Sequence, residues 1–210
     1  MTAKLLAKDR LSAVVAALMA DCRLYAPVRR DGELRFDAVA SAGEVVLDYR
    51  NTRRSPKALL VPQTGSLLRY SAVRDDLNRV DVVPLDATPT AILGLRPCDA
   101  RGYLFLDRIF AEGQYRDPYY IARRESTLVI ALACDHPRRT CFCHAFESGP
   151  YDRAGADVFL REAGDAYLAE AVTARGAALL ATLDLPDADE AHERAATESE
   201  ARAPARLEPI

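Results

Sequence analysis

The chain has 210 residues, of which 50% are apolar and 28% are charged, and its formal net charge is -3. This length and apolar content suit one large or two small globular domains with a buried core. The slightly negative charge argues against nucleic acid or an anionic membrane surface as a partner, because both attract basic proteins. The longest apolar runs, such as residues 127–133, are far too short to cross a bilayer, so we expect no membrane insertion.

The N-terminal part predicts a helix followed by a hairpin. Apolar residues repeat at helical spacing over residues 4–22. Lys8, Asp9 and Arg10 interrupt that stretch, which argues against a signal peptide and favours the first amphipathic helix of a cytoplasmic protein. Residues 25–41 then predict two short strands around Asp31-Gly32, a dipeptide typical of tight hairpin turns.

Strands and helices alternate in the middle of the chain, after a loop-rich stretch. Strands are predicted over 79–86, 90–96 and 127–134, a helix over 97–113, and a short helix or turn over 117–126. The segments 90–96 and 127–134 have no polar face, as in parallel strands that are covered by helices on both sides. A helical crossover between two such strands forms a right-handed β-α-β unit.

The C-terminal part predicts two strands around Gly164-Asp165 and a helix over 174–183. From Pro186 onward the sequence has almost no large apolar residue, so residues 185–210 are predicted to form a polar helical or disordered tail. The predicted fold of residues 1–184 is therefore α/β, with a mixed, partly parallel sheet flanked by helices, an N-terminal helix and a β-hairpin.

Four of the five cysteines are expected to meet at one edge of that sheet. One predicted parallel strand ends just before Cys98 and the other ends at Cys134, and the carboxyl ends of such strands lie on one edge. Cys141 and Cys143 form a C-x-C pair, whose side chains point the same way in an extended segment. Clustered thiols in a reducing compartment are more often metal ligands or redox groups than disulfides.

Four converging thiolates can hold either a tetrahedral zinc ion or a 4Fe-4S cluster. The spacing matches no standard ferredoxin or zinc finger, so unrelated buried thiols remain an alternative at this point. The N-terminus of the helix that begins near Asp99, together with Arg96, is expected to favour thiolates.

Other polar residues have simpler interpretations. Cys22 is expected to be an ordinary thiol, and His136 and His144 are left out of the coordination sphere, since four cysteines already complete it. The basic stretch at residues 51–57 is either a solvated loop or a contact for an acidic partner surface or a phosphate through Arg53, Arg54 and Lys57. The usual nucleotide-binding and acyl-transfer loops do not occur in the sequence.

Several long blocks carry a resemblance to a known family. They are LDYRNTRRSPKALLVPQ, LGLRPCDARGYLFLDRIF, DPYYIARRESTLVIALAC and CFCHAFESGP with the following GADVFLREAGDAYLAE. Together, from about residue 4 to residue 180, they resemble the N-terminal domain of an iron–sulfur electron-transfer family. That family includes the beta subunit of cytoplasmic sulfhydrogenases and the corresponding iron–sulfur subunit of anaerobic sulfite reductase.

The resemblance implies a non-catalytic electron-transfer subunit. Its partners would be a flavin subunit of the ferredoxin-reductase type, which reacts with NAD(P)H, and a catalytic hydrogenase or reductase subunit. Members usually carry two further clusters on C-x-x-C-x-x-C-x-x-x-C-P runs, and this sequence has none. We therefore expect either a truncated chain or a separate ferredoxin-like partner.

Cys98, Cys134, Cys141 and Cys143 all fall within the family's motif blocks, which implies that they bind an additional 4Fe-4S cluster. Zinc is the alternative ligand, because thiolates suit both. The competing function is a docking or structural module without redox activity, whose cysteines bind zinc or no metal.

Overall fold

The computed structural model describes residues 3–70 and 80–207 and contains a seven-stranded mixed sheet. Four central strands, β8, β7, β6 and β2, run parallel, and the outer strands pair antiparallel. Across the sheet, the strands are β1 (Lys4–Ala7), β9 (Ala166–Ala171), β8 (Val158–Ala163), β7 (Thr127–Leu132), β6 (Thr90–Leu95), β2 (Arg23–Arg30) and β3 (Glu33–Ala38). The predicted α/β class with a mixed, partly parallel sheet is confirmed.

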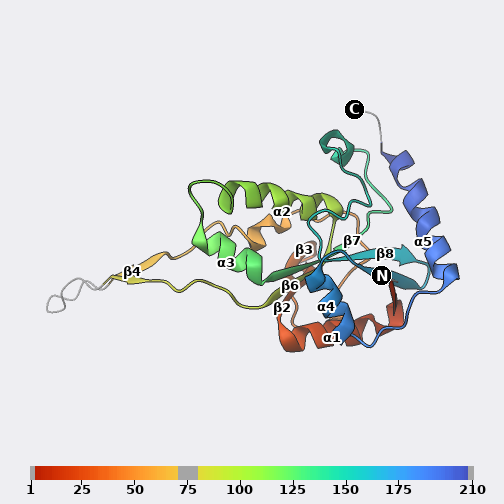
Figure 1. The fold of residues 1–210 in the computed structure, drawn as a ribbon, viewed down its shortest axis with the longest axis horizontal. Helices are drawn as coiled ribbons and strands as arrows, with labels where there is room; N and C mark the ends of the chain where they lie inside the picture. The colour runs from red at the N-terminus through yellow and green to blue at the C-terminus, as the bar shows by residue number, and fades with distance from the viewer. Residues whose placement is uncertain (1–2, 71–79, 208–210) are drawn as a thin grey trace.

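Helices cover both faces of the sheet (Figure 1). Helices α1 (Leu11–Asp21) and α4 (Ala174–Thr182) pack on one face, and α2 (Pro97–Phe110) and α3 (Pro118–Ser126) pack on the other. Short 3-10 helices are η1 (Lys8–Arg10), η2 (Ala42–Glu44), η3 (Pro56–Leu59), η4 (Cys143–Phe146) and η5 (Pro204–Arg206). The apolar runs of β6 and β7 lie between these layers, so both of their faces are buried.

The first helix starts later than its periodicity predicted. Lys4–Ala7 forms an edge strand that pairs antiparallel with β9, and the helix begins only at Leu11. Leu6 is buried in the core beside α1 in this arrangement. Periodicity does not reveal the change, because a few residues with mixed exposure fit a strand and a helix equally well.

The first hairpin forms as predicted. Strands β2 and β3 pair from Tyr25 with Ala38 to Arg30 with Glu33, and Asp31-Gly32 makes the turn. Both turn residues have positive φ, 51° and 79°, which the tight turn requires. The second hairpin, β8 and β9, also forms around Gly164-Asp165.

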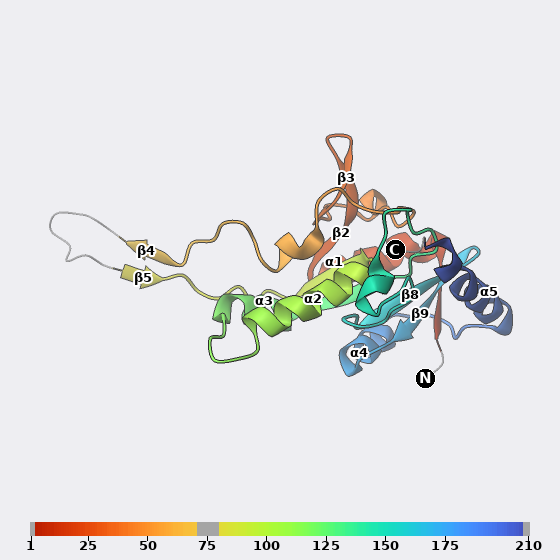
Figure 2. The same ribbon diagram turned by 90° about the horizontal axis from the view of Figure 1, so that it is seen from above.

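The strand predicted over 79–86 is shorter and lies outside the main sheet. β5 (Val80–Val82) pairs with β4 (Leu68–Tyr70) in a two-stranded ribbon that extends away from the body (Figure 2). Arg79 itself lies outside the described residues. The ribbon has apolar side chains on one face and the Arg69–Asp81 pair on the other, whereas a central strand needs two apolar faces.

The polar C-terminal segment contains helix α5 (Glu190–Arg202), which Asp189 caps by accepting a hydrogen bond from the His192 backbone at 2.9 Å. This helix packs beside β8 and β9, and Ala196 on its inner face is fully buried. The boundary at residue 184 between a main domain and a tail stays a prediction. Over the residues that the structure describes, the helices are too short or too polar to cross a bilayer.

Candidate functional site: a cysteine-lined pocket

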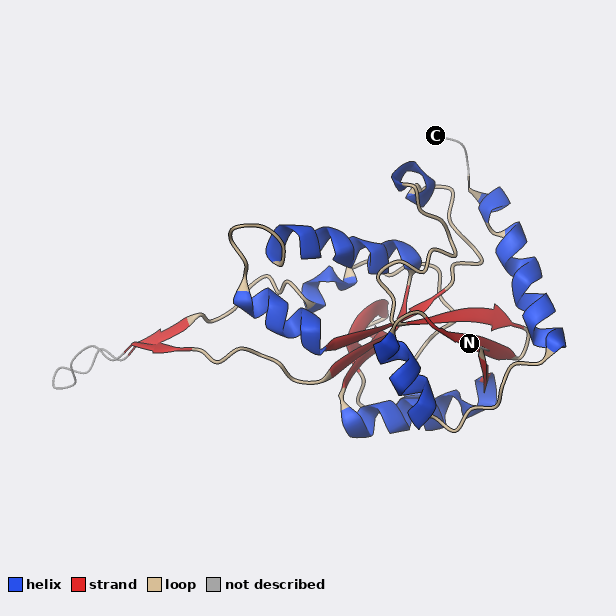
Figure 3. Ribbon diagram, viewed as in Figure 1, coloured by secondary structure: helices blue, strands red, loops and turns tan. Residues whose placement is uncertain are grey.

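A pocket of about 430 Å³ opens where the carboxyl ends of β6 and β7 meet α2 and the long loop after β7. Cys98, Cys134, Cys141 and Cys143 all line it. Figure 3 shows that the segment after β7, which supplies three of these cysteines, is loop except for one short helix. The structure thus brings the four predicted residues to one place, and whether they bind a metal stays a prediction.

Cys98 owes its position to the first turn of α2. Arg96 is the extended N-cap residue, with φ -71° and ψ 150°, and Pro97 opens the helix with a backbone angle that suits this position. Gly155 approaches this turn so closely that a Cβ there would lie 2.3 Å from the Ala100 carbonyl oxygen. The loop that follows the other cysteines is therefore packed directly against the helix that carries Cys98.

Backbone hydrogen bonds hold the other cysteines in place. The Cys134 amide donates to the Pro150 carbonyl at 2.9 Å, which closes the cysteine loop at its base. The Cys141 sulfur accepts a hydrogen bond from the Arg138 amide at 3.2 Å. Amide hydrogen bonds to sulfur are one of the means by which proteins tune iron–sulfur clusters.

Cys98 is exposed and the other three cysteines are partly buried, but the protein atoms around the pocket still limit the solvation of the Cys98 sulfur. Burial, followed by the nearby Asp99 and the other three cysteines, raises the pKa of Cys98 to about 12. Burial also raises the pKa of Cys134 and of Cys143. Arg96 acts in the expected direction, since it lowers the pKa of Cys134, but desolvation outweighs it there. The expected effect of the helix N-terminus stays a prediction. Metal binding, which displaces the protons, would stabilise the anionic sulfurs instead.

Arg96 is the most unusual side chain at the site, since its guanidinium is buried with only 9% of the residue exposed. It donates to three backbone carbonyls, those of Arg50, Tyr49 and Ala133, and lies 4.2 Å from the Tyr49 ring centroid. The described residues offer it no carboxylate within salt-bridge distance. A buried cation without an anion is costly, which favours an anionic group in the adjoining pocket.

Further charges surround Cys98. Burial raises the pKa of Asp99 to about 6, against the opposing effect of Lys57 and Arg96. The Lys57 side chain passes over Gly102, where an added Cβ would lie 2.8 Å from its Cε. Arg50 and Arg101 also line the pocket, so its lining residues carry four cations against one carboxylate.

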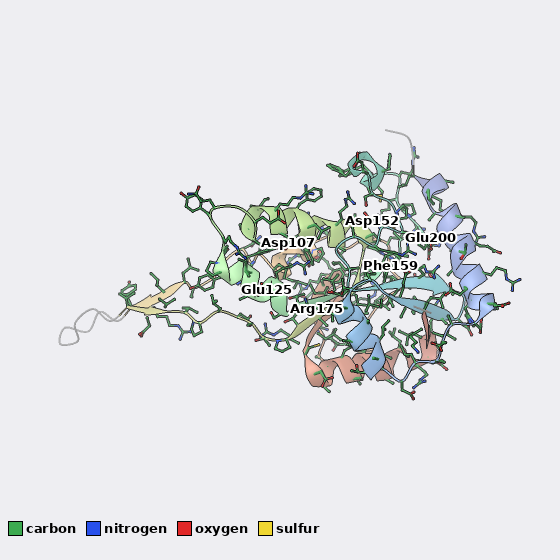
Figure 4. The ribbon with its side chains drawn as sticks, viewed as in Figure 1. Asp107, Glu125, Asp152, Phe159, Arg175 and Glu200 are labelled. Atoms are coloured by element: carbon green, nitrogen blue, oxygen red, sulfur yellow. The ribbon has the colours of Figure 1, made fainter. Side chains whose placement is uncertain are left out.

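An ion pair fixes the cysteine loop to α2. Arg101 binds the Asp152 carboxylate at 2.9 Å, and Ser148 donates to the same oxygen at 2.7 Å. Figure 4 shows Asp152 beside the end of α2 that faces the loop. The pKa of Asp152 falls despite burial, since hydrogen bonds from Ala154, Ser148 and Arg101 favour its charged form.

The donor set suits more than one kind of metal group. Four soft sulfur donors and a surplus of cations fit an anionic iron–sulfur cluster. Within residues 3–70 and 80–207, no three side chains of His, Cys, Asp or Glu are arranged to hold a single metal ion. Four thiolates would also suit a tetrahedral zinc ion, which stays the alternative.

Most of the residues that the sequence analysis left out of the metal site lie outside the cysteine pocket. Cys22 donates to the Leu18 carbonyl at 3.1 Å and borders a different hollow, between α1 and α4. Neither His136 nor His144 is among the residues that line the cysteine pocket. The His144 ring nitrogens are buried and have no hydrogen-bond partner among the described residues. Arg53 pairs with Glu33 at 3.0 Å, and of the three basic residues of its loop only Lys57 lines the pocket.

Sequence reasoning missed several residues of the site. Arg50 and the three phenylalanines Phe105, Phe142 and Phe146 line the pocket as well. Phe142 and Phe146 lie close to Cys141 and Cys143 in the sequence. Large apolar residues in an otherwise polar loop could have identified them as part of the site. Arg50 carried no such signal, because only the folded loop brings it near α2.

Comparisons with known proteins place these observations in context. The chain is 28% identical over 155 residues to sulfhydrogenase 2 subunit beta of Pyrococcus furiosus, a match that covers 73% of this chain and 43% of that protein. The chain thus spans less than half the length of this curated relative. No family model matches the chain, and no solved structure matches it. The similarity supports the predicted membership of this chain in the sulfhydrogenase beta subunit family.

Proposed function

We propose that this chain is an electron-transfer subunit, or a domain of one, in a cytoplasmic oxidoreductase complex of the hydrogenase or sulfite reductase type. The observation that carries the proposal is the single pocket lined by Cys98, Cys134, Cys141 and Cys143. The similarity to a hydrogenase beta subunit supports a role in such a complex. The partners would be a flavin subunit that reacts with NAD(P)H, a catalytic subunit, and in some arrangements a separate ferredoxin-like protein.

In this proposal the four cysteines would hold one 4Fe-4S cluster, and that cluster would supply one-electron redox chemistry. The protein contributes the surroundings. Arg96 and the other pocket cations stabilise the negative charge of the bound group, and amides of the cysteine loop donate to its sulfur ligands. The Arg101–Asp152 pair ties the loop to α2, the helix that carries Cys98.

The competing function is a docking module in which the thiols bind zinc or no metal. Zinc accepts the same thiolates, so ligand type does not separate the two. The similarity to a hydrogenase beta subunit favours the redox role over the docking module.

Anaerobic purification with metal analysis tests the proposal. We expect a brown protein with about four iron and four sulfide per chain. The double variant Cys141→Ser/Cys143→Ser should lose most of this iron, whereas Cys22→Ser, a thiol in a different hollow, should keep it. A colourless protein with about one zinc per chain would establish the docking module instead. Equal iron loss in both variants would contradict the ligand assignment.

A further inference from the structure

Three exposed aromatic side chains surround the mouth of the cysteine pocket. Phe105 on α2 is 43% exposed, and Phe142 and Phe146 in the cysteine loop are 60% and 55% exposed. The rings of Phe142 and Phe146 lie 5.9 Å apart, and all three residues line the pocket. We call these three side chains the aromatic rim. A group of exposed aromatics from two separate segments is typical of an interaction surface.

Positive charge surrounds the aromatic rim. Arg50 and Lys57 are exposed on the same pocket and have no salt bridge within the described part of the chain. The Arg108 guanidinium lies 5.8 Å from the centroid of Phe105. Two carboxylates lie nearby: Asp99 lines the pocket and is partly buried, and Glu147 is exposed beside Phe146 and Arg108. This cationic region stands out because the whole chain has a net charge of -3.

We infer that the aromatic rim and its cations form a docking face for an acidic redox protein. Charge complementarity determines the sign of the partner's surface, since unpaired cations attract a negative patch. The apolar centre with a charged border matches the layout of protein interfaces. The inference rests on the proposed function, because it identifies the partner of the same pocket. In the docked complex one electron leaves the partner's centre and enters the cluster, or the reverse.

The position of the face explains why it should be an electron-exchange surface. Cys98 and the C-x-C pair line the same pocket as the aromatic rim, so a protein seated on the rim would lie close to a group bound there. Its surface would also exclude water from the pocket. Electron-transfer contacts are often small and transient, and steering by charge gives them fast association.

The test measures the binding of a strongly acidic ferredoxin to the full chain by stopped-flow fluorescence, with both iron-loaded and iron-free protein. The variant Arg50→Glu/Lys57→Glu should lower the association rate constant at least tenfold at low salt and remove most of its salt dependence. The control Arg10→Glu/Arg194→Glu has the same net charge but changes exposed residues of η1 and α5. It should stay within about twofold of the native chain.

The contribution of the aromatic rim is tested by measuring the dissociation rate constant. Phe142→Ala/Phe146→Ala should raise the dissociation rate constant about tenfold and leave association nearly unchanged. Tyr115→Ala is the matched control, because Tyr115 is 85% exposed but does not line the pocket. It should have no effect on either rate.

Two results would overturn the docking face: no binding of the acidic ferredoxin to the iron-loaded chain, or equal effects of the reversal and control variants. Iron content is measured on the same samples and decides the proposed function separately. An iron-loaded chain that does not bind refutes the face alone. A chain that takes up no iron yet binds through these residues refutes the cluster alone.

Discussion

A single buried arginine joins three parts of the site. Arg96 contacts the carbonyls of Tyr49 and Arg50 from the loop before η3, and that of Ala133 at the end of β7. It also immediately precedes the helix that carries Cys98. The planar guanidinium can serve several acceptors at fixed angles, which an ammonium group cannot do. Arg96 therefore sets the distance between the two strand ends and the loop.

Replacing this arginine should destabilise the fold. Arg96→Met leaves three carbonyl oxygens without their donor, and each such loss costs about 1–3 kcal/mol when the group is buried. We expect the free energy of unfolding to fall by about 3 kcal/mol or more in urea titrations. Arg96→Lys should lower the free energy of unfolding by a smaller amount, since an ammonium group reaches only some of these carbonyls. Arg194→Met, an exposed control, should stay within about 0.5 kcal/mol of the native chain. A stable Arg96→Met variant would refute this role.

Among the elements, the contact between α2 and the loop before β8 depends on one glycine. Gly155 has a φ of 83°, and its Cα faces the Ala100 carbonyl with no room for a side chain. The neighbouring Arg101–Asp152 pair reinforces the same contact. The loop that carries three cysteines is thus tied to the helix that carries the fourth.

Three glycine substitutions distinguish the energetic cost of a positive φ from the cost of a steric clash at Cβ. Gly155→Ala combines positive φ with a backbone clash and should cost about 3 kcal/mol or more in unfolding free energy. Gly164→Ala has positive φ but open space around it and should cost about 1–2 kcal/mol. Gly43→Ala has neither and should stay within about 0.5 kcal/mol. Equal costs for Gly155→Ala and Gly164→Ala would show that the loop is not packed tightly against α2.

For the molecule as a whole, α5 connects the polar C-terminal segment to the sheet by charge. Arg161 is only 8% exposed and binds Glu193 at 2.9 Å. Arg153 pairs with Glu170 at 3.0 Å and with Glu200 at 3.1 Å. His192 lies between Asp189 at 2.8 Å and Asp165 at 3.2 Å. A sequence with few large apolar residues can therefore still dock, through a buried alanine and ion pairs.

The histidine makes this attachment pH-dependent. Hydrogen bonds to Asp189 and then to Asp165 raise the pKa of His192 above its usual value of 6.5. The stabilisation is complete below about pH 6.5 and is lost as the pH rises through the higher folded-state pKa. His192→Gln should thus remove a fall in Tm that the native chain shows above about pH 6.5. An unchanged pH profile of Tm in the variant would contradict this link.

The sequence alone predicted most of the main sheet and the gathering of the cysteines. Tight turns at Asp31-Gly32 and Gly164-Asp165 need local conformations that few residues adopt, so both hairpins were predictable. Strands β6 and β7 were evident from apolar runs, and their shared edge placed Cys98 near Cys134. Hydrophobic periodicity and composition are local properties of the sequence, so they can be recognised without the folded structure.

Tertiary structure alone decided the features that depend on distant segments. Lys4–Ala7 forms a strand because it pairs with the edge of β9. Val80–Val82 lies outside the main sheet because only one of its faces is apolar. The raised pKa of Cys98 depends partly on Cys134, Cys141 and Cys143, and the carbonyls that surround Arg96 also come from distant parts of the sequence. The desolvation of a thiol, the pairing of a strand and the excess of cations at a pocket all depend on which groups lie nearby in space. A local sequence pattern does not specify those neighbours.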